Sequence, residues 1–390
     1  MDYAVIASLF LLLFLGVADN QMIAAMLPDL VKGFSVTLQQ GGLLVVVYSV
    51  MAAASSFGSG ALSDHYGRRP FLWAGVWLFA VASALSSQSG SFTTLLMARA
   101  ITGIAAGTIS TCSIAYAGDW FAYSVRGRAI GLISVAYFAA PIIGVPLGAQ
   151  IADRLGWRST FLFFAGLAVV VGLSSFRLAK DEPSQEARGR KPSDTAKAFY
   201  RFLQRRDLRA AAAVAFLVSG GLVGFITYLS AWLNQRFGLT TRGVGLVFML
   251  SGLVAIGGAP VGGILADRWG KRRASIVSNL LLGGAIAMLP LLPWGLALLA
   301  VFALTSLGAA LRQGPVTALM TELVPTAQRG SFIALRNIAS QLGIGSAAFV
   351  GGILYQRFGY GSVTSLCAVM TFVVAGLLAL YLPEPDPSQT

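Results

Sequence analysis

Histidine and cysteine are almost absent from this sequence. It contains one histidine, His65, and two cysteines, Cys112 and Cys367, in 390 residues. Metal-binding clusters of histidine and cysteine, and catalytic triads built on histidine, are therefore excluded. The two cysteines lie in apolar segments far apart along the chain, so they are interpreted as small buried side chains and not as a disulfide. These absences indicate that the protein is not an enzyme.

Charged residues are also scarce. They make up 11% of the chain, against roughly 25% in soluble domains, whereas hydrophobic residues make up 56%. Apolar runs of ~20 residues are long enough to cross a bilayer as helices. We therefore predict an all-α membrane protein with twelve spans, at approximately 4–27, 38–62, 71–87, 92–117, 129–152, 158–178, 210–235, 243–265, 274–293, 296–321, 331–353 and 362–382.

One long polar segment divides the spans into six and six. It covers residues 179–209 and is too short to form a separate domain. We predict an N-terminal six-helix bundle at 1–178, a cytoplasmic linker at 179–209 and a C-terminal six-helix bundle at 210–390.

A nucleotide-binding loop is missing as well. The glycine pairs at 257–258 and 262–263 are not followed by the Gly-Lys-Ser/Thr sequence of a phosphate-binding loop. ATP-driven transport is therefore disfavoured. We expect no cofactor, and energy must come from an ion or substrate gradient.

The net charge of +13 could reflect a nucleic-acid partner. The positions of the basic residues along the chain test this interpretation. If both termini lie on one side of the membrane, most Lys and Arg residues fall on that side, including the basic run from Arg177 to Arg209. The positive-inside rule then places both termini in the cytoplasm. We expect no nucleic-acid partner, assign the basic excess to topology and lipid headgroups, and predict a multi-pass protein of the bacterial inner membrane.

A short charged hairpin connects the second and third predicted spans. It reads GSGALSDHYGRRP from Gly58 to Pro70. Its glycines permit the backbone conformations of a tight turn, and its acidic and basic side chains suit helix ends. The pattern returns as GGILADRWGKRR from Gly262 to Arg273, at a constant offset of 203 residues.

The same offset relates other residues of the two halves. It pairs Asp119 with Glu322 and Gly148 with Gly351. A sequence that repeats over half its length with helices in parallel order predicts two similar bundles, related by an axis along the membrane normal.

These motifs resemble those of the major facilitator superfamily, and the resemblance covers the whole chain. Arg99-x-x-x-Gly103 is similar to the fourth-helix motif of that family. Gly144-Val-Pro146-Leu-Gly148 resembles, in an imperfect form, the Gly/Pro motif of its antiporter branch. The two hairpins resemble the signature loop between helices two and three and its second copy through Gly60, Asp64, Gly67, Arg68, Arg69, Gly263, Asp267, Gly270, Lys271 and Arg272.

The resemblance implies two bundles around a central cavity and alternating access by rocking of the halves. It also implies that the loop acidic residue docks at the start of a helix in the other half, with Asp64 near Ser331 and Asp267 near Ala129. A carboxylate at a helix N-terminus contributes about 0.3–1 kcal/mol at exposed sites and up to ~2 kcal/mol when partly buried. We therefore predict that the hairpins act as inner-gate latches.

Asp19 is the most unusual residue of the first span. It stands about 8 residues, roughly 12 Å, below the outer surface, and Arg99 stands about 7 residues, roughly 10 Å, from the same surface. A carboxylate at this depth is costly unless it faces a partner or a wet cavity. We predict that Asp19 and Arg99 form the proton-coupling pair. The alternatives are Asp19 in the headgroup region and a static ion pair that only holds the bundle together.

The C-terminal half has no copy of Asp19, since the equivalent position is Leu222. It has Arg312 and Arg336 inside spans. These side chains attract an anionic group if they face the cavity, and they are structural if they pack against Glu322 or the linker. The predicted substrate-cavity residues are Asn20, Gln21, Arg312, Gln313, Arg336, Asn337 and Gln341.

The fifth span contains Pro141, Gly144, Pro146 and Gly148. Proline removes backbone hydrogen bonds, and small residues allow close helix approach. We predict a kink and tight packing against the other half; ordinary membrane-helix composition is the alternative.

The sequence therefore predicts a monomeric secondary transporter for proton-coupled efflux of a small amphipathic drug or metabolite. Burial would favour a neutral Asp19 and Arg99 would favour its carboxylate, so the proton on Asp19 could change with access. Uptake or exchange of an anionic metabolite bound by Arg312 and Arg336 is one alternative. A membrane sensor that retains the fold without transporting is another.

Overall fold

The computed structural model describes residues 2–176, 178–179, 199–324, 329–382 and 384. Every regular element in these residues is a helix, and twelve helical segments are long and apolar enough to cross a membrane. The predicted all-α fold with twelve spans is therefore confirmed. Residues 180–198 of the predicted linker lie outside the described residues.

The first six spans contain one divided helix, the fifth, which is broken into four helical pieces. The elements are α1 (Tyr3–Phe34), α2 (Leu38–Tyr66), α3 (Arg68–Ser87), α4 (Phe92–Trp120), α5 (Tyr123–Ser134), α6 (Ala136–Ala139), the π-helix η1 (Ala140–Gly144), α7 (Val145–Leu155) and α8 (Trp157–Ser175).

The last six spans begin within the segment predicted as linker, because α11 starts at Arg206. Their elements are α11 (Arg206–Phe237), α12 (Thr241–Trp269), α13 (Lys271–Met288), the 3-10 helix η2 (Leu289–Leu291), α14 (Leu296–Thr321), α15 (Arg329–Phe358) and α16 (Tyr360–Tyr381).

Glycines with positive φ separate neighbouring helices at equivalent places in the two halves. Gly67 and Gly270 have φ of 90° and 88°, and Gly156 and Gly359 have φ of 84° and 77°. Side chains other than glycine rarely adopt this backbone region. The 203-residue repeat therefore preserves the turns as well as the spans.

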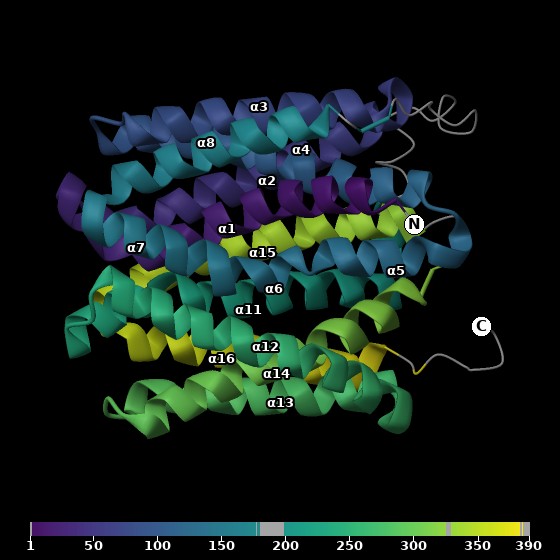
Figure 1. Ribbon diagram of the computed structural model, residues 1–390. Helices are drawn as coiled ribbons and strands as arrows, with labels where there is room; N and C mark the ends of the chain where they lie inside the picture. Colours follow the sequence, from purple (N-terminus) through teal and green to yellow (C-terminus); the bar gives the residue numbers. More distant parts are fainter. Residues whose placement is uncertain (1, 177, 180–198, 325–328, 383, 385–390) are drawn as a thin grey trace.

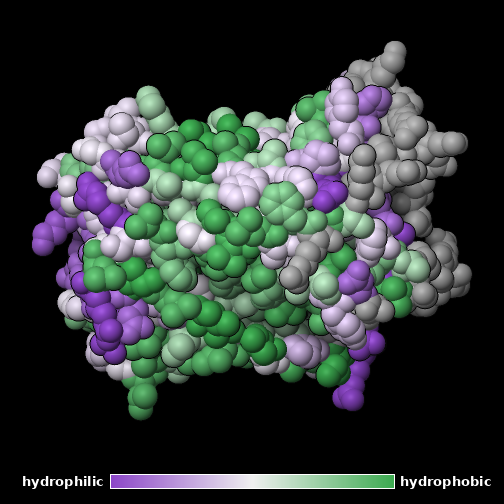
Figure 2. Space-filling model, turned by 45° about the horizontal axis from the view of Figure 1, so that its top comes forward, coloured by the Kyte–Doolittle hydropathy of each residue, from purple (hydrophilic) through white to green (hydrophobic). Residues whose placement is uncertain are grey.

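The bundle has two ends with different turns. We call the end that carries Gly67 and Gly270 the motif end, and the end that carries the turns at Ser35 and Gly238 the distal end. The start of α1 and the finish of α16 both lie at the motif end, on the right in Figure 1. Figure 2 shows hydrophobic residues across the middle of the visible surface and hydrophilic residues towards both ends, as expected for a membrane-spanning bundle.

Close helix contacts in each half depend on glycine. A Cβ atom at Gly103 of α4 would overlap the carbonyl oxygen of Tyr48 in α2. In the second half, a Cβ atom at Gly343 of α15 would overlap the carbonyl oxygen of Phe216 in α11. Small residues allow helix backbones to approach closely in membranes, and here they hold α2 against α4 and α15 against α11.

The two halves are joined along α2 and α15 and by further contacts near the distal end. The Ser230 hydroxyl of α11 donates to the carbonyl oxygen of Ala24 in α1. Thr241 Oγ1, in the first turn of α12, donates to Asp29 Oδ2 of α1 at 2.5 Å. Span five packs on α12 through α7 and η1 but hardly through α5, which lies nearer the motif end. The distal ends of these spans are therefore drawn together.

Candidate functional site

Asp19 and Arg99 form a buried ion pair between α1 and α4. Arg99 Nη1 donates to Asp19 Oδ2 at 2.5 Å, and the side chains are 0% and 1% exposed for Arg99 and Asp19 respectively. The structure thus brings together the two residues that the sequence places at one depth. Loss of either charge would leave the other one buried without a partner, which is energetically costly.

Tyr48 of α2 lies beside this pair and was not predicted from the sequence. Its ring lies 4.8 Å from the Arg99 guanidinium carbon. Its hydroxyl donates to the carbonyl oxygen of Gly16, one turn before Asp19, at 3.1 Å. Gly103 allows the close approach of α2, so the glycine of the Arg99-x-x-x-Gly103 motif is the signal that could have indicated a neighbour here.

Arg99 retains unused donors. Its Nε and Nη2 atoms are buried and have no hydrogen-bond partner among the described residues. The face of the Tyr48 ring offers an electrostatic contact but not a full hydrogen bond. The guanidinium is therefore held mainly by one carboxylate oxygen, a bond that protonation of Asp19 would weaken.

The divided fifth span packs against α1 on either side of Asp19. A Cβ atom at Gly144 would lie 2.6 Å from Cβ of Ala18, and one at Gly148 would overlap the side chain of Met22. Pro141 lies within η1 (Ala140–Gly144), where the helix widens to π geometry. Pro and π segments are common causes of helix irregularity.

The same span also touches α12 of the other half. A Cβ atom at Gly245 would lie 2.8 Å from Cβ of Ala149 and 3.3 Å from Cα of Pro146. A Cβ atom at Gly252 would overlap the side chain of Ile142. The fifth span thus connects the neighbours of Asp19 with the second bundle.

Among the described residues, Arg312 forms hydrogen bonds only within its own half, and its Nε atom is buried without a partner. Its Nη1 atom donates to Asn279 Oδ1 of α13 at 3.0 Å, and its Nη2 atom donates to the carbonyl oxygen of Val218 in α11 at 2.9 Å. The side chain is 1% exposed. No hydrogen bond or ion pair joins it to Glu322 or to a described linker residue. The next residue, Gln313, is exposed.

Arg336 has a different environment. Its side chain is partly buried, and no described residue forms a hydrogen bond or an ion pair with it. Tyr137 of α6, in the other half, is 44% exposed.

The remaining predicted cavity residues are partly buried amides: Asn20, Gln21, Asn337 and Gln341. The Asn20 Oδ1 and Gln341 Oε1 atoms are buried and have no hydrogen-bond partner among the described residues. Buried acceptors without partners are rare in folded proteins, and these two can accept hydrogen bonds from a ligand.

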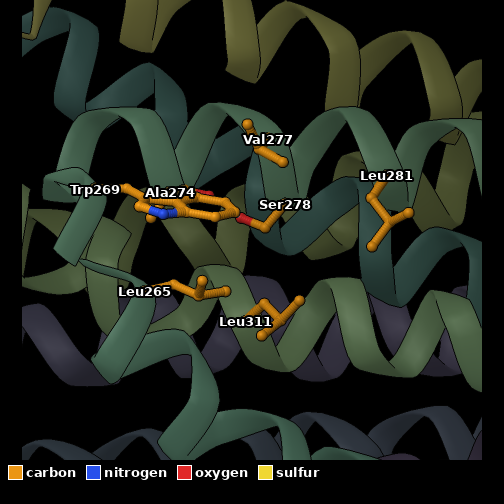
Figure 3. Close-up of a pocket in the computed structure, with 7 residues that line it drawn as sticks. All are labelled: Leu265, Trp269, Ala274, Val277, Ser278, Leu281 and Leu311. Atoms are coloured by element: carbon orange, nitrogen blue, oxygen red, sulfur yellow. The ribbon is translucent and has the colours of Figure 1, made fainter. Parts of the chain in front are cut away.

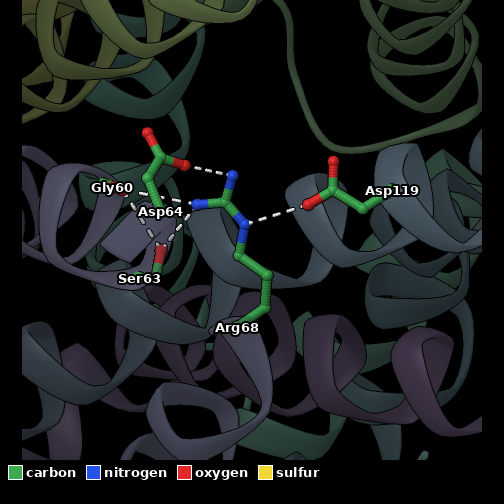
Figure 4. Close-up of polar contacts among 5 residues, drawn as sticks. All are labelled: Gly60, Ser63, Asp64, Arg68 and Asp119. Carbon is green, nitrogen blue, oxygen red and sulfur yellow. Dashed lines mark hydrogen bonds and ion pairs between the residues drawn. The ribbon is translucent and has the colours of Figure 1, made fainter. Parts of the chain in front are cut away.

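The first hairpin is organised around Arg68 (Figure 4). Arg68 forms an ion pair with Asp64, and its Nε atom donates to Asp119 Oδ2 of α4 at 3.2 Å. Its Nη1 atom donates to Ser63 Oγ at 2.7 Å and to the carbonyl oxygen of Gly60 at 3.3 Å. Arg69 Nη2 donates to the carbonyl oxygen of Phe176, which ties the hairpin to α8.

The second hairpin repeats this arrangement with a lysine. Lys271 Nζ lies 2.5 Å from Glu322 Oε1 of the α14 end, in the place of the Arg68–Asp119 contact. The Lys271 and Arg272 amides donate to the Glu384 carboxylate at 2.6 and 2.8 Å, so an acidic side chain after the last span caps α13. Gly263 is partly buried and Asp267 is exposed.

Within the part of the chain that the structure describes, neither loop carboxylate has a hydrogen bond or ion pair with the other half. Asp64 binds Arg68 of its own hairpin, and Asp267 has no hydrogen bond or ion pair with a described residue. The polar contacts of α1 with the second half lie near the distal end, and the inner-gate role of both hairpins stays a prediction.

A shallow apolar groove lies between α12, α13 and α14 (Figure 3). Its lining is mostly hydrophobic, and the Ser278 hydroxyl donates to the Ala274 carbonyl oxygen within its own helix. The lining residues are Leu265, Trp269, Ala274, Val277, Ser278, Leu281 and Leu311.

Comparison with known proteins agrees with this fold. The family model described as Major Facilitator Superfamily matches residues 9–296 and 215–390. The chain is 28% identical to the uncharacterized MFS-type transporter YwfA of Bacillus subtilis (strain 168), over 91% of this chain and 86% of that protein. It is 23% identical to Multidrug resistance protein 2 of the same strain, over 91% and 88%. The crystal structure of a D-xylose-proton symporter superposes with a TM-score of 0.80 at 16% identity, over 98% of both chains.

Proposed function

Because this chain belongs to the Major Facilitator Superfamily, we propose that it is a proton-coupled secondary transporter that exports a small amphipathic drug or metabolite by alternating access. The observation that carries the proposal is the Asp19–Arg99 pair, which is almost fully buried between α1 and α4. Ionisable residues at such depth mark proton and ion pathways in membrane proteins.

The coupling step is the making and breaking of this ion pair. The ion pair holds Arg99 only while Asp19 carries its negative charge. We propose that a proton taken up by Asp19 from the more acidic side neutralises this charge and releases Arg99. Gly144 and Gly148 pack beside Asp19, and the same span touches α12. Breaking the Asp19–Arg99 ion pair can therefore change how the fifth span packs against the other half.

The direction of transport rests on similarity. Multidrug resistance protein 2, to which the chain is similar over most of both lengths, is named for resistance to drugs, which favours export. We place the motif end, with both termini, in the cytoplasm of a bacterium, because the basic residues gather there. The transporter acts as a monomer in the inner membrane, and a proton gradient replaces any cofactor.

Reconstitution into liposomes tests this function. A pH gradient should drive accumulation of at least one of chloramphenicol, ethidium and benzoate, and Asp19→Asn should remove the effect of the gradient. Proton-driven accumulation that persists in Asp19→Asn would contradict the coupling role of Asp19. Absence of any flux with intact, folded protein would favour a membrane sensor that does not transport.

A second function, uptake or exchange of an anionic metabolite, is favoured by one observation. Arg336 is partly buried and has no carboxylate partner among the described residues. An arginine stays charged in proteins, so a ligand anion would supply the missing countercharge. Flux of benzoate without dependence on a pH gradient would support this function over proton-coupled efflux.

A further inference from the structure

The apolar groove between α12, α13 and α14 lies at the motif end, on the outside of the second bundle. Its helix α13 packs mainly on α12, α14 and α16 of its own half. Two of the lining residues in Figure 3, Trp269 at the end of α12 and Val277 of α13, are 54% and 52% exposed. Tryptophan near the end of a span is typical of the membrane–water interface. The groove therefore opens towards lipid at the level where acyl chains meet headgroups.

Two arginines lie directly beyond the groove at the motif end. Arg273 is one helical turn before Val277, and Arg268 is three residues after Leu265, another lining residue. Residues three or four apart share a helix face, so both arginines lie on the faces that line the groove. Both are exposed, and no described residue forms a hydrogen bond or an ion pair with either. The end of the groove thus carries two positive charges without a described partner.

The neighbouring carboxylates are placed or occupied elsewhere. Asp267 lies two residues before Trp269, and residues two apart point to different sides of a helix. Glu322 pairs with Lys271, and Glu384 accepts hydrogen bonds from the first two amides of α13. The two arginines therefore favour an anion from outside the chain.

The first half lacks this combination of residues. At the offset of 203 residues, His65 and Pro70 stand in the places of the two arginines. Phe71 stands in the place of Ala274, whose small side chain lines the groove. The two charges and the small lining residue are therefore specific to the second half and do not belong to the repeated fold.

We infer that this groove binds an anionic phospholipid, with an acyl chain along Val277 and Leu281 and the headgroup at Arg268 and Arg273. Arginine donates two parallel hydrogen bonds to a phosphate, and basic residues beside an apolar span attract anionic lipids. The lipid is a structural partner and not a substrate, so the inference does not depend on the proposed function. A bound lipid would link α12 to α13 beside the second hairpin.

Fluorescence quenching in liposomes tests this site. The full chain with Leu280→Cys, beside the lining residue Leu281, carries a small thiol-linked fluorophore on α13. The liposomes are phosphatidylcholine with a varied fraction of brominated phosphatidylglycerol or, in parallel, of brominated phosphatidylcholine with the same acyl chains. Bromine quenches only at close range, so quenching reports which lipid occupies the groove. Each basic residue near the membrane surface favours an anionic lipid by about 5-fold, so phosphatidylglycerol should bind about 5- to 30-fold more tightly.

Leu78→Cys supplies the matched label position. Leu78 is also an exposed leucine, and it lies at a similar depth in α3, the equivalent helix of the first half. A fluorophore there should be quenched equally by the two brominated lipids, because the first half lacks both arginines.

Arginine variants test the headgroup contact. With the α13 label, Arg268→Gln/Arg273→Gln should remove the preference for phosphatidylglycerol, and Arg273→Gln alone should lower it by about 5-fold. Both side chains are exposed, so the variants should fold, which circular dichroism checks. Arg128→Gln/Arg201→Gln removes two exposed arginines of the motif end outside the groove and should retain the preference.

Several outcomes would overturn the inference. These are equal quenching of the α13 label by the two lipids, the same preference at both label positions, and a preference that survives in Arg268→Gln/Arg273→Gln. Weaker quenching of the α13 label than of the α3 label by both lipids would show that a second protein copy, and not lipid, covers the groove.

Discussion

At the scale of single residues, Arg99 depends on a small number of contacts. Asp19 gives it one close oxygen, the Tyr48 ring lies 4.8 Å from its guanidinium carbon, and two of its nitrogen atoms are buried without described partners. Few alternative contacts remain if one of these is lost. The pair is therefore suited to respond to a single proton.

Tyr48 should position Arg99 through two separable contacts. Tyr48→Phe loses the hydrogen bond to Gly16 and should cost about 1 kcal/mol of unfolding free energy. Tyr48→Leu also loses the cation–π contact, which is worth about 2 kcal/mol when desolvated. Chemical unfolding in detergent measures both variants. Equal stability of Tyr48→Phe and Tyr48→Leu would show that the ring face does not hold Arg99.

Gly103 is expected to tolerate no side chain. Gly103→Ala places a methyl group against the Tyr48 carbonyl oxygen, and overpacking of this kind costs typically about 1–3 kcal/mol. Gly118→Ala is the matched control, because it lies in the same helix and a Cβ atom there meets nothing within 4 Å. Thermal unfolding of both variants compares the sites. Similar melting temperatures would contradict the close packing of α2 and α4.

At the scale of elements, the distal contact between α1 and α12 should favour the conformation described here. Asp29→Ala removes the acceptor of the Thr241 hydroxyl. Hydrogen bonds to charged groups contribute about 1.5–3 kcal/mol, so the equilibrium between conformations should move about 10-fold or more towards separation of the distal ends. Distances between spin labels on the distal ends of α1 and α12 would report this shift.

The control for this experiment is Asp153→Ala, which removes an exposed carboxylate at the same end of the bundle. No described residue hydrogen-bonds to Asp153, so its loss should leave the label distances unchanged. An equal shift in both variants would indicate a general effect of charge at the distal surface and not a specific contact.

At the scale of the whole molecule, the sequence predicted the features that depend on its internal repeat and on the depth of a residue within its span. The twelve spans follow from long apolar runs, and the shared depth of Asp19 and Arg99 follows from the helical rise. The turns at Gly67 and Gly270 follow from the repeated hairpins. Each of these is encoded locally or by a fixed offset along the chain.

Other features could not be predicted, because apolar side chains surround every helix in a membrane. Hydrophobic periodicity then fails to fix the rotation of a span about its axis, so nothing marked Tyr48 as the neighbour of Arg99. The same ambiguity left Arg312 and Arg336 equivalent until their partners were known. Glu384 caps α13 because the chain after the last span returns to the start of that helix. Neither the internal repeat nor residue spacing predicts this contact.

If the transported compound is an organic anion, as in the second candidate function, the membrane potential contributes to the energetics of transport. Outward movement of an anion and inward movement of a proton both follow a membrane potential that is negative inside, worth about 2.3 kcal/mol per charge per 100 mV. Proton-coupled export of such a compound would therefore draw on both the pH gradient and the electrical potential.

The central claim, that Asp19 carries the coupled proton, is tested most directly by recording proton movement into liposomes with a pH-sensitive dye during benzoate transport. Wild-type protein should move protons in the direction opposite to benzoate. Asp19→Asn, and the Asp19→Asn/Arg99→Gln variant that leaves no unpaired buried charge, should still exchange benzoate across the membrane but move no protons. Benzoate-dependent proton movement that persists in either variant would contradict the account.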